Sequence, residues 1–265
     1  MYTTLLSLAY GHNTKEARVD EHASLQRYDT TEVLLNFSGR RVRITKIADI
    51  EALLEHVDPV TFAEDERLPY WAELWPSSVA LARYVMQRLD LAGQHVLELG
   101  CGLGLVGLVA AMQGGRVLCT DYEADALAFA RSNARRNACR QTRFRLVDWR
   151  RPALRRRYDI VLASDVLYEA RNFGPLMALL QRYLARGGCA VFSEPGRANA
   201  IPFFALLRQR GFIYQTETVP LEWDGSHQIA VSTIHHRGFQ PTARCHLAAG
   251  ADEKVRPERC TPRVS

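Results

Sequence analysis

Residues 96–104 read Val96-Leu97-Glu98-Leu99-Gly100-Cys101-Gly102-Leu103-Gly104, and this stretch decides the fold of the 265-residue chain. A short apolar strand pattern runs into glycines at alternate positions, and an apolar helical pattern follows. Because glycine has no side chain, such a loop can turn tightly and let a ligand approach its backbone closely. Asp121 follows 21 residues after Gly100, where dinucleotide-binding folds keep an acid that accepts hydrogen bonds from ribose hydroxyls.

Strand and helix patterns alternate around and after this loop. The seven predicted strands cover about 95–99, 116–120, 142–147, 158–164, 189–193, 212–219 and 227–235. The predicted helices between them cover about 103–113, 123–137, 174–186 and 199–210, the third ending at Gly187-Gly188. Alternation of this kind indicates an α/β fold, with a mostly parallel sheet and helices on both faces. Because no helix separates the last two strands, one of them should run antiparallel.

Three segments lie outside this alternation. Residues 33–47 show two apolar runs around Ser38-Gly39-Arg40, which predicts a β-hairpin. Residues 76–89 begin Pro-Ser-Ser and continue with an apolar helical pattern, so we expect a helix with a serine cap. Residues 238–265 contain three prolines and no strong period, which predicts a flexible tail.

Composition narrows the class of protein. Hydrophobic residues make up 47% and charged residues 24%, which excludes long disorder, collagen and coiled coil as the main architecture. The net charge of +5 is well short of a dedicated nucleic-acid scaffold. The 6 cysteines show no CxxC spacing, so we expect neither structural zinc nor a disulfide framework. The N-terminal sequence lacks a signal-peptide pattern, and no apolar run approaches ~20 residues, so we expect a cytoplasmic protein without a membrane partner.

The acid followed by Gly-x-Gly-x-Gly, Glu98–Gly104, resembles motif I of the class I (seven-β-strand) S-adenosylmethionine (SAM) methyltransferases. The resemblance implies a Rossmann-like fold with SAM as cofactor, the loop holding its methionine moiety and Asp121 its ribose. Asp148-Trp149, just after the third strand, would meet the adenine, the carboxylate accepting from the exocyclic amine and the ring stacking. The alternative for the glycines alone is a tight turn in any α/β protein.

Three further elements indicate the methyl acceptor. Asp165-x-x-Tyr168 follows the fourth strand and resembles the motif of the seven-strand protein-lysine methyltransferases, rather than the Asn/Asp-Pro-Pro-Tyr of nucleobase or glutamine methylators. Tyr70–Pro76 resembles the aromatic segment that these enzymes place over the cofactor. Glu194–Arg197 is similar to the acid-Pro-Gly-Arg element of the branch that methylates the β-subunit of electron transfer flavoprotein, with Glu in place of Asp. The resemblance covers about residues 65–235.

The resemblance implies a candidate site beyond the carboxyl ends of the strands, where open parallel sheets bind ligands. A lysine has a reference pKa of about 10.4, so the site must admit an ammonium and let it lose a proton. Asp165 would attract and orient that amine, Tyr168 would offer a hydroxyl and an aromatic face, and Glu194 would be a second anion. The residues expected to bind the cofactor are Trp75, Glu98, Gly100, Cys101, Gly102, Gly104, Asp121, Tyr122, Asp148, Trp149 and Ser164.

Structural alternatives accompany these roles. Asp165 could cap a loop, Tyr168 and Trp75 could be packed aromatics, and Glu194 could pair with Arg197, while Trp71 is expected in the core. Functional alternatives also stay open, since fold does not fix function. They are a small-molecule N-methyltransferase, a SAM-binding module without catalysis, and an RNA methyltransferase suggested by the many arginines. His235-His236 has no carboxylate or cysteine cluster around it, so we expect no metal site.

The predicted organisation is an extension over 1–64 with the hairpin, a SAM-binding methyltransferase domain over 65–237, and the tail over 238–265. The acceptor would be a protein that carries the target lysine. Residues 131–157 hold eleven arginines and one acid, Asp148, so this stretch carries +10 (11 − 1) and the rest −5 (5 − 10). We expect Arg143 and Arg145 to face outward from an edge strand, where charge deters aggregation. The alternative is that Arg131–Arg157 docks an acidic protein partner, and nucleic acid is the less favoured ligand.

Overall fold

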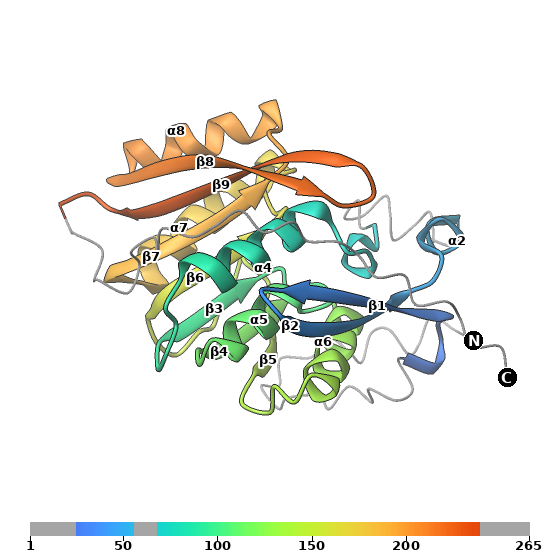
Figure 1. Cartoon of the computed structure of the whole chain (residues 1–265). Coiled ribbons are helices and arrows are strands. Elements are labelled where there is room, and N and C mark those ends of the chain that lie inside the picture. Colours follow the sequence, from blue (N-terminus) through green and yellow to red (C-terminus); the bar gives the residue numbers. More distant parts are fainter. Residues whose placement is uncertain (1–24, 56–67, 239–265) are drawn as a thin grey trace, which may run out of the picture.

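The computed structural model describes residues 25–55 and 68–238. Its centre is a seven-stranded sheet in the order β5-β4-β3-β6-β7-β9-β8 (Figure 1). Its strands are β3 (His95–Leu99), β4 (Arg116–Asp121), β5 (Arg143–Leu146), β6 (Tyr158–Ser164), β7 (Leu184–Glu194), β8 (Phe212–Glu222) and β9 (Ser226–His236). β9 runs antiparallel to both of its neighbours, and the other pairs are parallel. The predicted sheet, with its one antiparallel strand, is confirmed.

Helices cover both faces of this sheet. The helices are α2 (Ile50–Glu55), α4 (Pro76–Arg88), α5 (Leu105–Met112), α6 (Ala124–Arg136), α7 (Phe173–Tyr183) and α8 (Ile201–Gln209), with short 3-10 turns η1 (Tyr70–Ala72), η2 (Ala170–Asn172) and η3 (Ala198–Ala200). Val96 and Leu97 are neighbours on β3 and point to opposite faces. Val96 belongs to the core that α4, α5 and α6 share, and Leu97 to the core of α7 and α8.

The central strands β3, β6 and β7 are continuously buried over residues 96–99, 160–163 and 188–194, because both of their faces are covered. Parallel strands end at a common edge of the sheet. β3 ends before Gly100, β4 ends at Asp121, β6 ends before Asp165, and β7 ends at Glu194. The topology therefore gathers four positions singled out in the sequence at one edge.

Two predicted helix signals are wrong. α4 begins at Pro76, with Trp75 as its N-cap and no side-chain cap, because proline suits the first helical position. α7 ends at Tyr183, and Gly187 and Gly188 lie within β7, not at a helix stop. A Cβ at position 188 would lie 2.5 Å from the Asp159 carbonyl oxygen, so glycine there permits close pairing with β6 at a register shift.

β5 is an edge strand as expected, but its predicted alternation is only partly correct. Arg143 is exposed, whereas Arg145 is half-buried and donates to the Ala153 carbonyl at 2.8 Å. Leu146, expected to face inward, is 57% exposed. Phe144 packs partly against the core and carries the Arg131 guanidinium 5.8 Å above its ring. β5 has only 4 residues and lies at the edge of the sheet, so its pattern is too short to predict which side chains are buried.

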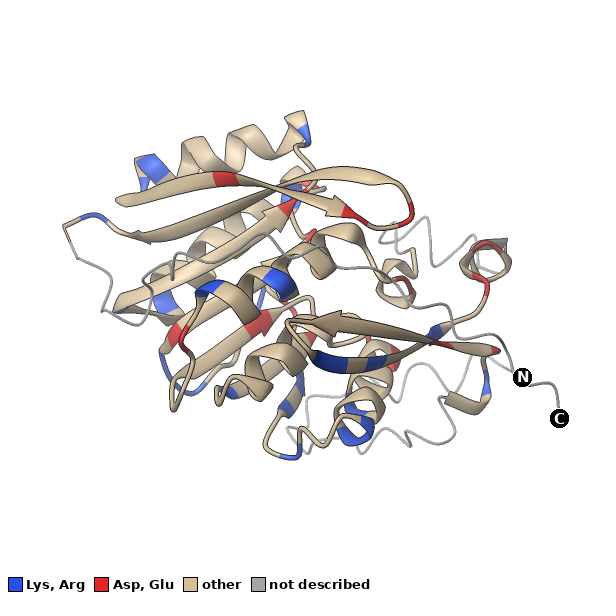
Figure 2. Cartoon of the chain, in the orientation of Figure 1, with Lys and Arg blue, Asp and Glu red and all other residues tan. Residues whose placement is uncertain are grey.

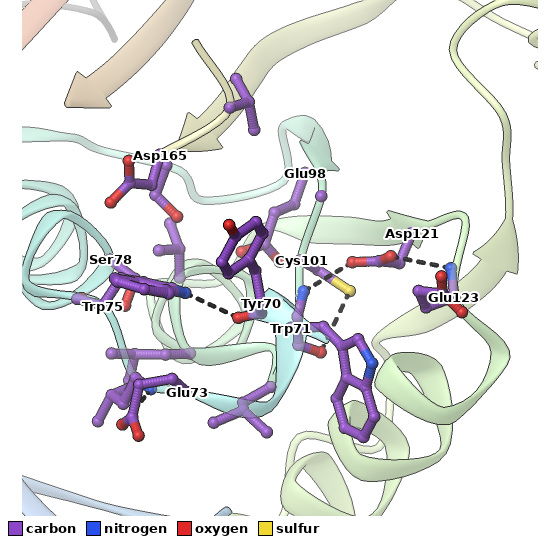
Figure 3. A pocket seen from close by; sticks show the side chains of 18 of the residues that line it. Tyr70, Trp71, Glu73, Trp75, Ser78, Glu98, Cys101, Asp121, Glu123 and Asp165 are labelled. Carbon is purple, nitrogen blue, oxygen red and sulfur yellow. Dashed lines mark hydrogen bonds between the residues drawn. The ribbon is translucent and has the colours of Figure 1, made fainter. Parts of the chain in front are cut away.

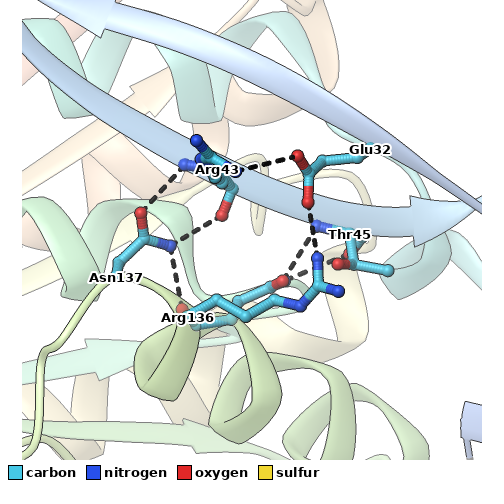
Figure 4. Close-up of polar contacts among 6 residues, drawn as sticks. Glu32, Arg43, Thr45, Arg136 and Asn137 are labelled. Carbon is cyan, nitrogen blue, oxygen red and sulfur yellow. Dashed lines mark hydrogen bonds and ion pairs between the residues drawn. The ribbon is translucent and has the colours of Figure 1, made fainter. Parts of the chain in front are cut away.

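The predicted hairpin is confirmed as β1 (Thr30–Phe37) and β2 (Arg40–Ile47), joined by Ser38 and Gly39 in left-handed backbone. Asn133 and Asn137, one turn apart on α6, hold β2 as a neighbouring strand would (Figure 4). Asn133 accepts from the Thr45 N–H at 2.8 Å and donates to its carbonyl at 3.1 Å. Asn137 makes the same pair of bonds with Arg43, at 2.9 and 2.6 Å.

Asn133 is fully buried yet satisfied, since its amide also donates to the Leu103 carbonyl at 3.0 Å. The hairpin is therefore bonded, through α6, to the glycine loop. Glu32 adds ion pairs to Arg43 at 3.8 Å and to Arg136 at 2.5 Å. The four described cysteines, Cys101, Cys119, Cys139 and Cys189, are free and buried.

Two predictions fall outside the described residues. The boundary at residues 64–65 lies in the segment 56–67, and the tail over 238–265 lies beyond the last described residue except for Gly238. Both stay predictions. Of the helices described, none is both long and apolar enough to cross a bilayer. Within the same described ranges, no group of three or more His, Cys, Asp or Glu side chains is placed to hold a metal ion.

Candidate active site

A pocket lies at the carboxyl edge of the sheet, between the loops after β3, β4 and β6 and the segment that leads into α4 (Figure 3). Asp121 and Asp165 lie on opposite sides of it. We call the side of Gly100, Gly102 and Asp121 the glycine-loop end, and the side of Asp165 the Asp165 end. The predicted site residues that line the pocket are Trp75, Glu98, Gly100, Cys101, Gly102, Asp121, Tyr122, Trp149, Ser164, Asp165 and Tyr168.

Backbone hydrogen bonds fix the glycine-loop end. The Asp121 carboxylate accepts from the Gly102 N–H at 2.9 Å and from the Glu123 N–H at 3.0 Å. Gly102 has φ +49°, and a Cβ there would lie 3.2 Å from the Trp71 carbonyl oxygen. A side chain at this position would therefore meet strain and a close contact together. Burial raises the pKa of Asp121, and the backbone N–H groups of Glu123, Gly102 and Tyr122 act against that rise.

Gly104 has a different role from its two neighbours in the motif. It does not line the pocket, and it is the N-cap of α5 with φ +85°. A Cβ on Gly104 would lie 2.9 Å from the Ala130 Cβ. The third glycine thus permits close packing of α5 against α6.

Glu98 links the end of β3 to α5, on the two sides of the glycine loop. Its side chain is buried, and its Oε2 accepts from the Gly107 N–H at 3.0 Å. Burial raises the pKa of Glu98 to about 8, so at neutral pH the group is mostly a neutral acid. Burial also raises the pKa of Cys101 to about 11, which keeps this thiol protonated and unreactive.

A second pocket adjoins the first and shares Leu68, Tyr70, Tyr122, Trp149 and Tyr168 with it. Asp148 lines only this second pocket, where Arg150 engages both of its oxygens, the Nε–oxygen distances being 2.9 Å. The Trp149 ring lies against the glycine loop, since a Cβ on Gly100 would be 3.2 Å from its Cζ2. The Trp149 Nε1 is buried and has no partner among the described residues.

Aromatic side chains cover the pocket. The Tyr70 ring lies edge-on to the rings of Trp75 and Tyr168, with centroid distances of 5.9 and 5.8 Å. The Trp75 Nε1 donates to the Tyr70 carbonyl at 2.7 Å. Trp71 packs on Tyr28 and Phe129, as expected for a core residue, and it also lines the pocket. Tyr70 was not among the predicted site residues, although the aromatic segment that contains it was the available signal.

The Asp165 end is held by side chains from two loops. Asp165 has φ +56°, uncommon for a residue with a side chain, and its N–H donates to the Ser193 carbonyl at 2.8 Å. Its Oδ1 forms an ion pair with the Arg197 guanidinium, and its side chain is 11% exposed. Burial, with a contribution from Glu169, raises the pKa of Tyr168 to about 12, so its hydroxyl stays neutral and can donate.

Glu194 does not line the pocket. Its Oε2 accepts from the Arg197 backbone N–H at 2.7 Å, and the residue borders a separate groove between α8 and β8. The alternative pairing of Glu194 with Arg197 thus exists through the backbone, while the Arg197 side chain turns to Asp165. Its expected role as a second anion beside the amine stays a prediction. Sequence reasoning missed the Asp165–Arg197 pair because the two residues follow different strands.

Residues 55–210 match a protein family described as lysine methyltransferase. The chain belongs to this family. The matched range spans the aromatic segment Tyr70–Pro76, the glycine loop, Asp165-x-x-Tyr168 and Glu194–Arg197. Family membership agrees with the resemblance of the motifs.

Two relatives and one solved structure illustrate the match. EEF1A lysine methyltransferase 3 of Mus musculus is 32% identical over 153 residues, 55% of this chain and 66% of that protein. Electron transfer flavoprotein beta subunit lysine methyltransferase of Xenopus laevis is 31% identical over 138 residues, 49% of this chain and 54% of that protein. The chain spans about half to two thirds of the length of these relatives.

The near-equal sequence identities of the two relatives to this chain favour neither relative's substrate.

Precorrin-6y C5,15-methyltransferase from Geobacter metallireducens shares the fold, with a TM-score of 0.50 at 15% identity over 60% of this chain and 88% of that chain.

Proposed function

We propose that this protein transfers a methyl group from SAM to the side-chain amine of a lysine in a protein substrate, and that it does so in the cytoplasm. The observation that carries the proposal is a single pocket with a glycine loop and Asp121 on one side and Asp165 on the other, and Tyr168 in the same lining. Family membership supports the reaction class. The lysine acceptor and its protein follow from the Asp165-x-x-Tyr168 element and from the names of the relatives.

The pocket residues fit SAM at three places. The Asp121 carboxylate receives two N–H bonds, and a carboxylate has about four lone-pair positions, so it keeps capacity for a ribose hydroxyl. The Trp149 side chain lines both pockets, as an adenine site requires. The backbone of Gly100 and Gly102 lines the pocket without a side chain in the way. Asp148 would have to share its carboxylate with Arg150 to reach the exocyclic amine.

When bound, SAM supplies an electrophilic methyl group on a sulfonium. The chain's own residues have to align the amine in line with that methyl and exclude water. Asp165 Oδ2 has no hydrogen-bond partner among the described residues, so it is available to an incoming ammonium. Tyr168, which is half-buried and neutral, lines the same pocket and offers a hydroxyl and a ring face to the substrate. The aromatic cover of Tyr70 and Trp75 limits access of water from above.

Incubation of the protein with methyl-labelled SAM and a cell lysate tests the proposal. We expect a labelled protein band whose label maps to lysine by mass spectrometry. SAM binding measured by calorimetry, with no labelled protein, would overturn protein methylation. Label in the small-molecule fraction alone would favour a small-molecule N-methyltransferase instead.

A docking role for the arginine-rich stretch belongs to this proposal as its second part. Several of its arginines are used within the fold: Arg136 pairs with Glu32, and Arg157 donates to the Leu184 carbonyl at 2.8 Å. Arg140, Arg143 and Arg155 are exposed. We infer that an acidic protein substrate contacts these exposed arginines. Figure 2 shows how the Lys and Arg residues are distributed over the described part of the chain.

A further inference from the structure

Asp165 lines the pocket that is expected to receive a lysine, and it forms an ion pair with Arg197, which borders the separate groove between α8 and β8. The Asp165 side chain is 11% exposed and the Arg197 side chain 34%. The pair joins the loop after β6 to the loop after β7, and the turn that carries Arg197 is fixed by the bond from its N–H to Glu194. The guanidinium therefore reaches the carboxylate from outside the pocket and engages its Oδ1.

The charge of this pair matters for the chemistry. An isolated carboxylate beside a lysine stabilises the ammonium and so raises the pKa of that lysine. The ammonium has no lone pair and cannot accept a methyl group, so strong binding of the charged form opposes the reaction. A cation that neutralises the carboxylate removes this obstacle while it leaves one oxygen free to orient the amine.

We propose that Arg197 is a positioning residue that holds Asp165 by one oxygen and offsets its charge, so that the site favours the neutral amine of the acceptor lysine. This inference rests on the proposed function and specifies how the charge of Asp165 in the proposed lysine site is compensated. Nothing in the glycine loop supplies such a cation.

The other ionisable groups around the pocket leave Arg197 as the compensating charge. Glu73 is paired with Lys46, and Glu98 is buried beneath the loop as a neutral acid. Asp121 is bonded to two backbone N–H groups on the opposite side. Glu123 lies on the Asp121 side, and Tyr168 is neutral. The described residues that line the pocket include no arginine, lysine or histidine, so the cation that compensates Asp165 comes from the neighbouring groove, as Arg197.

The test is the pH profile of kcat for Arg197→Gln, with the lysine protein found in the lysate assay as substrate. Loss of the guanidinium leaves Asp165 uncompensated, so the acceptor holds its proton to higher pH. We expect the rising limb of the profile to move up by about one pH unit, as expected for a unit charge at close range. Activity at pH 7 should fall by about tenfold and recover at high pH.

Two variants control this measurement. Arg197→Lys keeps the positive charge, and its profile should stay close to the wild type. Arg208→Gln removes an exposed cation from the same outer groove, where it stacks on Tyr214 at 4.8 Å, and should leave the profile unchanged. SAM affinity by calorimetry and the melting temperature verify that each variant is folded.

An equal loss of kcat at every pH in Arg197→Gln, without a shift, would overturn the inference and leave Arg197 as a structural contact. An unshifted profile with only a raised KM would overturn it in favour of a docking role. Absence of lysine methylation by the wild type at any pH is a separate result, because it removes the proposed function itself and this inference with it.

Discussion

The two ends of the pocket are held in place by different kinds of contact. At the glycine-loop end, backbone N–H groups bond to Asp121, and glycines fit where side chains would clash. At the Asp165 end, an aspartate in left-handed backbone pairs with an arginine from another loop. The contacts of a backbone-built end depend little on which side chains are present. Those of a side-chain-built end can be changed by single substitutions.

The largest effect should come from Asp165→Ala. It removes the group that orients the amine, so we expect kcat to fall by about 10²- to 10⁴-fold, the range for a positioned acid or base. SAM affinity should stay within several-fold, because the glycine-loop end does not depend on Asp165. Radiolabel transfer and calorimetry measure the two quantities. Asp165→Asn is the control, since asparagine also tolerates the left-handed backbone; unchanged turnover in either variant contradicts the role of the carboxylate.

Asp121→Ala should show the reverse pattern. It removes a carboxylate that accepts from the loop and, under the proposal, from the ribose. We expect the dissociation constant of SAM to rise by about 10- to 100-fold, the loss of one or two charge-assisted hydrogen bonds. At saturating SAM, kcat should stay near the wild-type value. Equal losses of kcat in the Asp121 and Asp165 variants would mean that the two ends do not act separately.

The same contrast explains what the sequence could predict. The glycine-loop end is local: nine residues, one strand and an acid at fixed spacing specify it, and Gly100, Gly102 and Asp121 line the pocket as expected. Gly104 was included by its spacing alone, yet it serves helix packing. The seven strand segments and the one antiparallel strand were predicted equally well, because the period of apolar residues determines which segments become strands.

The Asp165 end could be predicted only in part. Asp165 and Tyr168 lie in one short motif, and both line the pocket. Arg197 is 32 residues away from Asp165, and only the packing of β6 against β7 brings the two loops together. Glu194 has the right chemistry and stands at a strand end, but its carboxylate is turned to the backbone of its own loop. Side-chain direction at a strand end depends on the loop, which periodicity does not encode.

Glu98→Gln tests how far the glycine-loop end depends on protonation. Glu98 stays protonated in the folded protein up to a pKa of about 8, whereas in the unfolded chain it ionises near 4.5. As pH rises from 5 to 8, ionisation of Glu98 therefore stabilises the unfolded state relative to the folded state. This group lowers the free energy of unfolding of the wild type by up to ~1.4 kcal/mol per pH unit. Glutamine does not titrate. We expect the stability difference between variant and wild type, from urea unfolding at several pH values, to grow in favour of the variant; parallel pH dependences would contradict it.

The smallest effect is expected from charge reversal of exposed arginines, which tests which end of the pocket the substrate protein covers. β5 lies at the glycine-loop side of the sheet, and β8 at the other edge, beyond Asp165. If an acidic substrate contacts the arginine-rich side, reversal of the exposed Arg140, Arg143 and Arg155 to Glu should raise KM by about two- to threefold, more at low salt. Arg157 is kept because it bonds to backbone carbonyls. The matched control reverses three exposed arginines near β8, Arg208, Arg210 and Arg237. A raised KM in the control set alone would place docking over the Asp165 end and leave the arginines of β5 the role of protecting a sheet edge from aggregation.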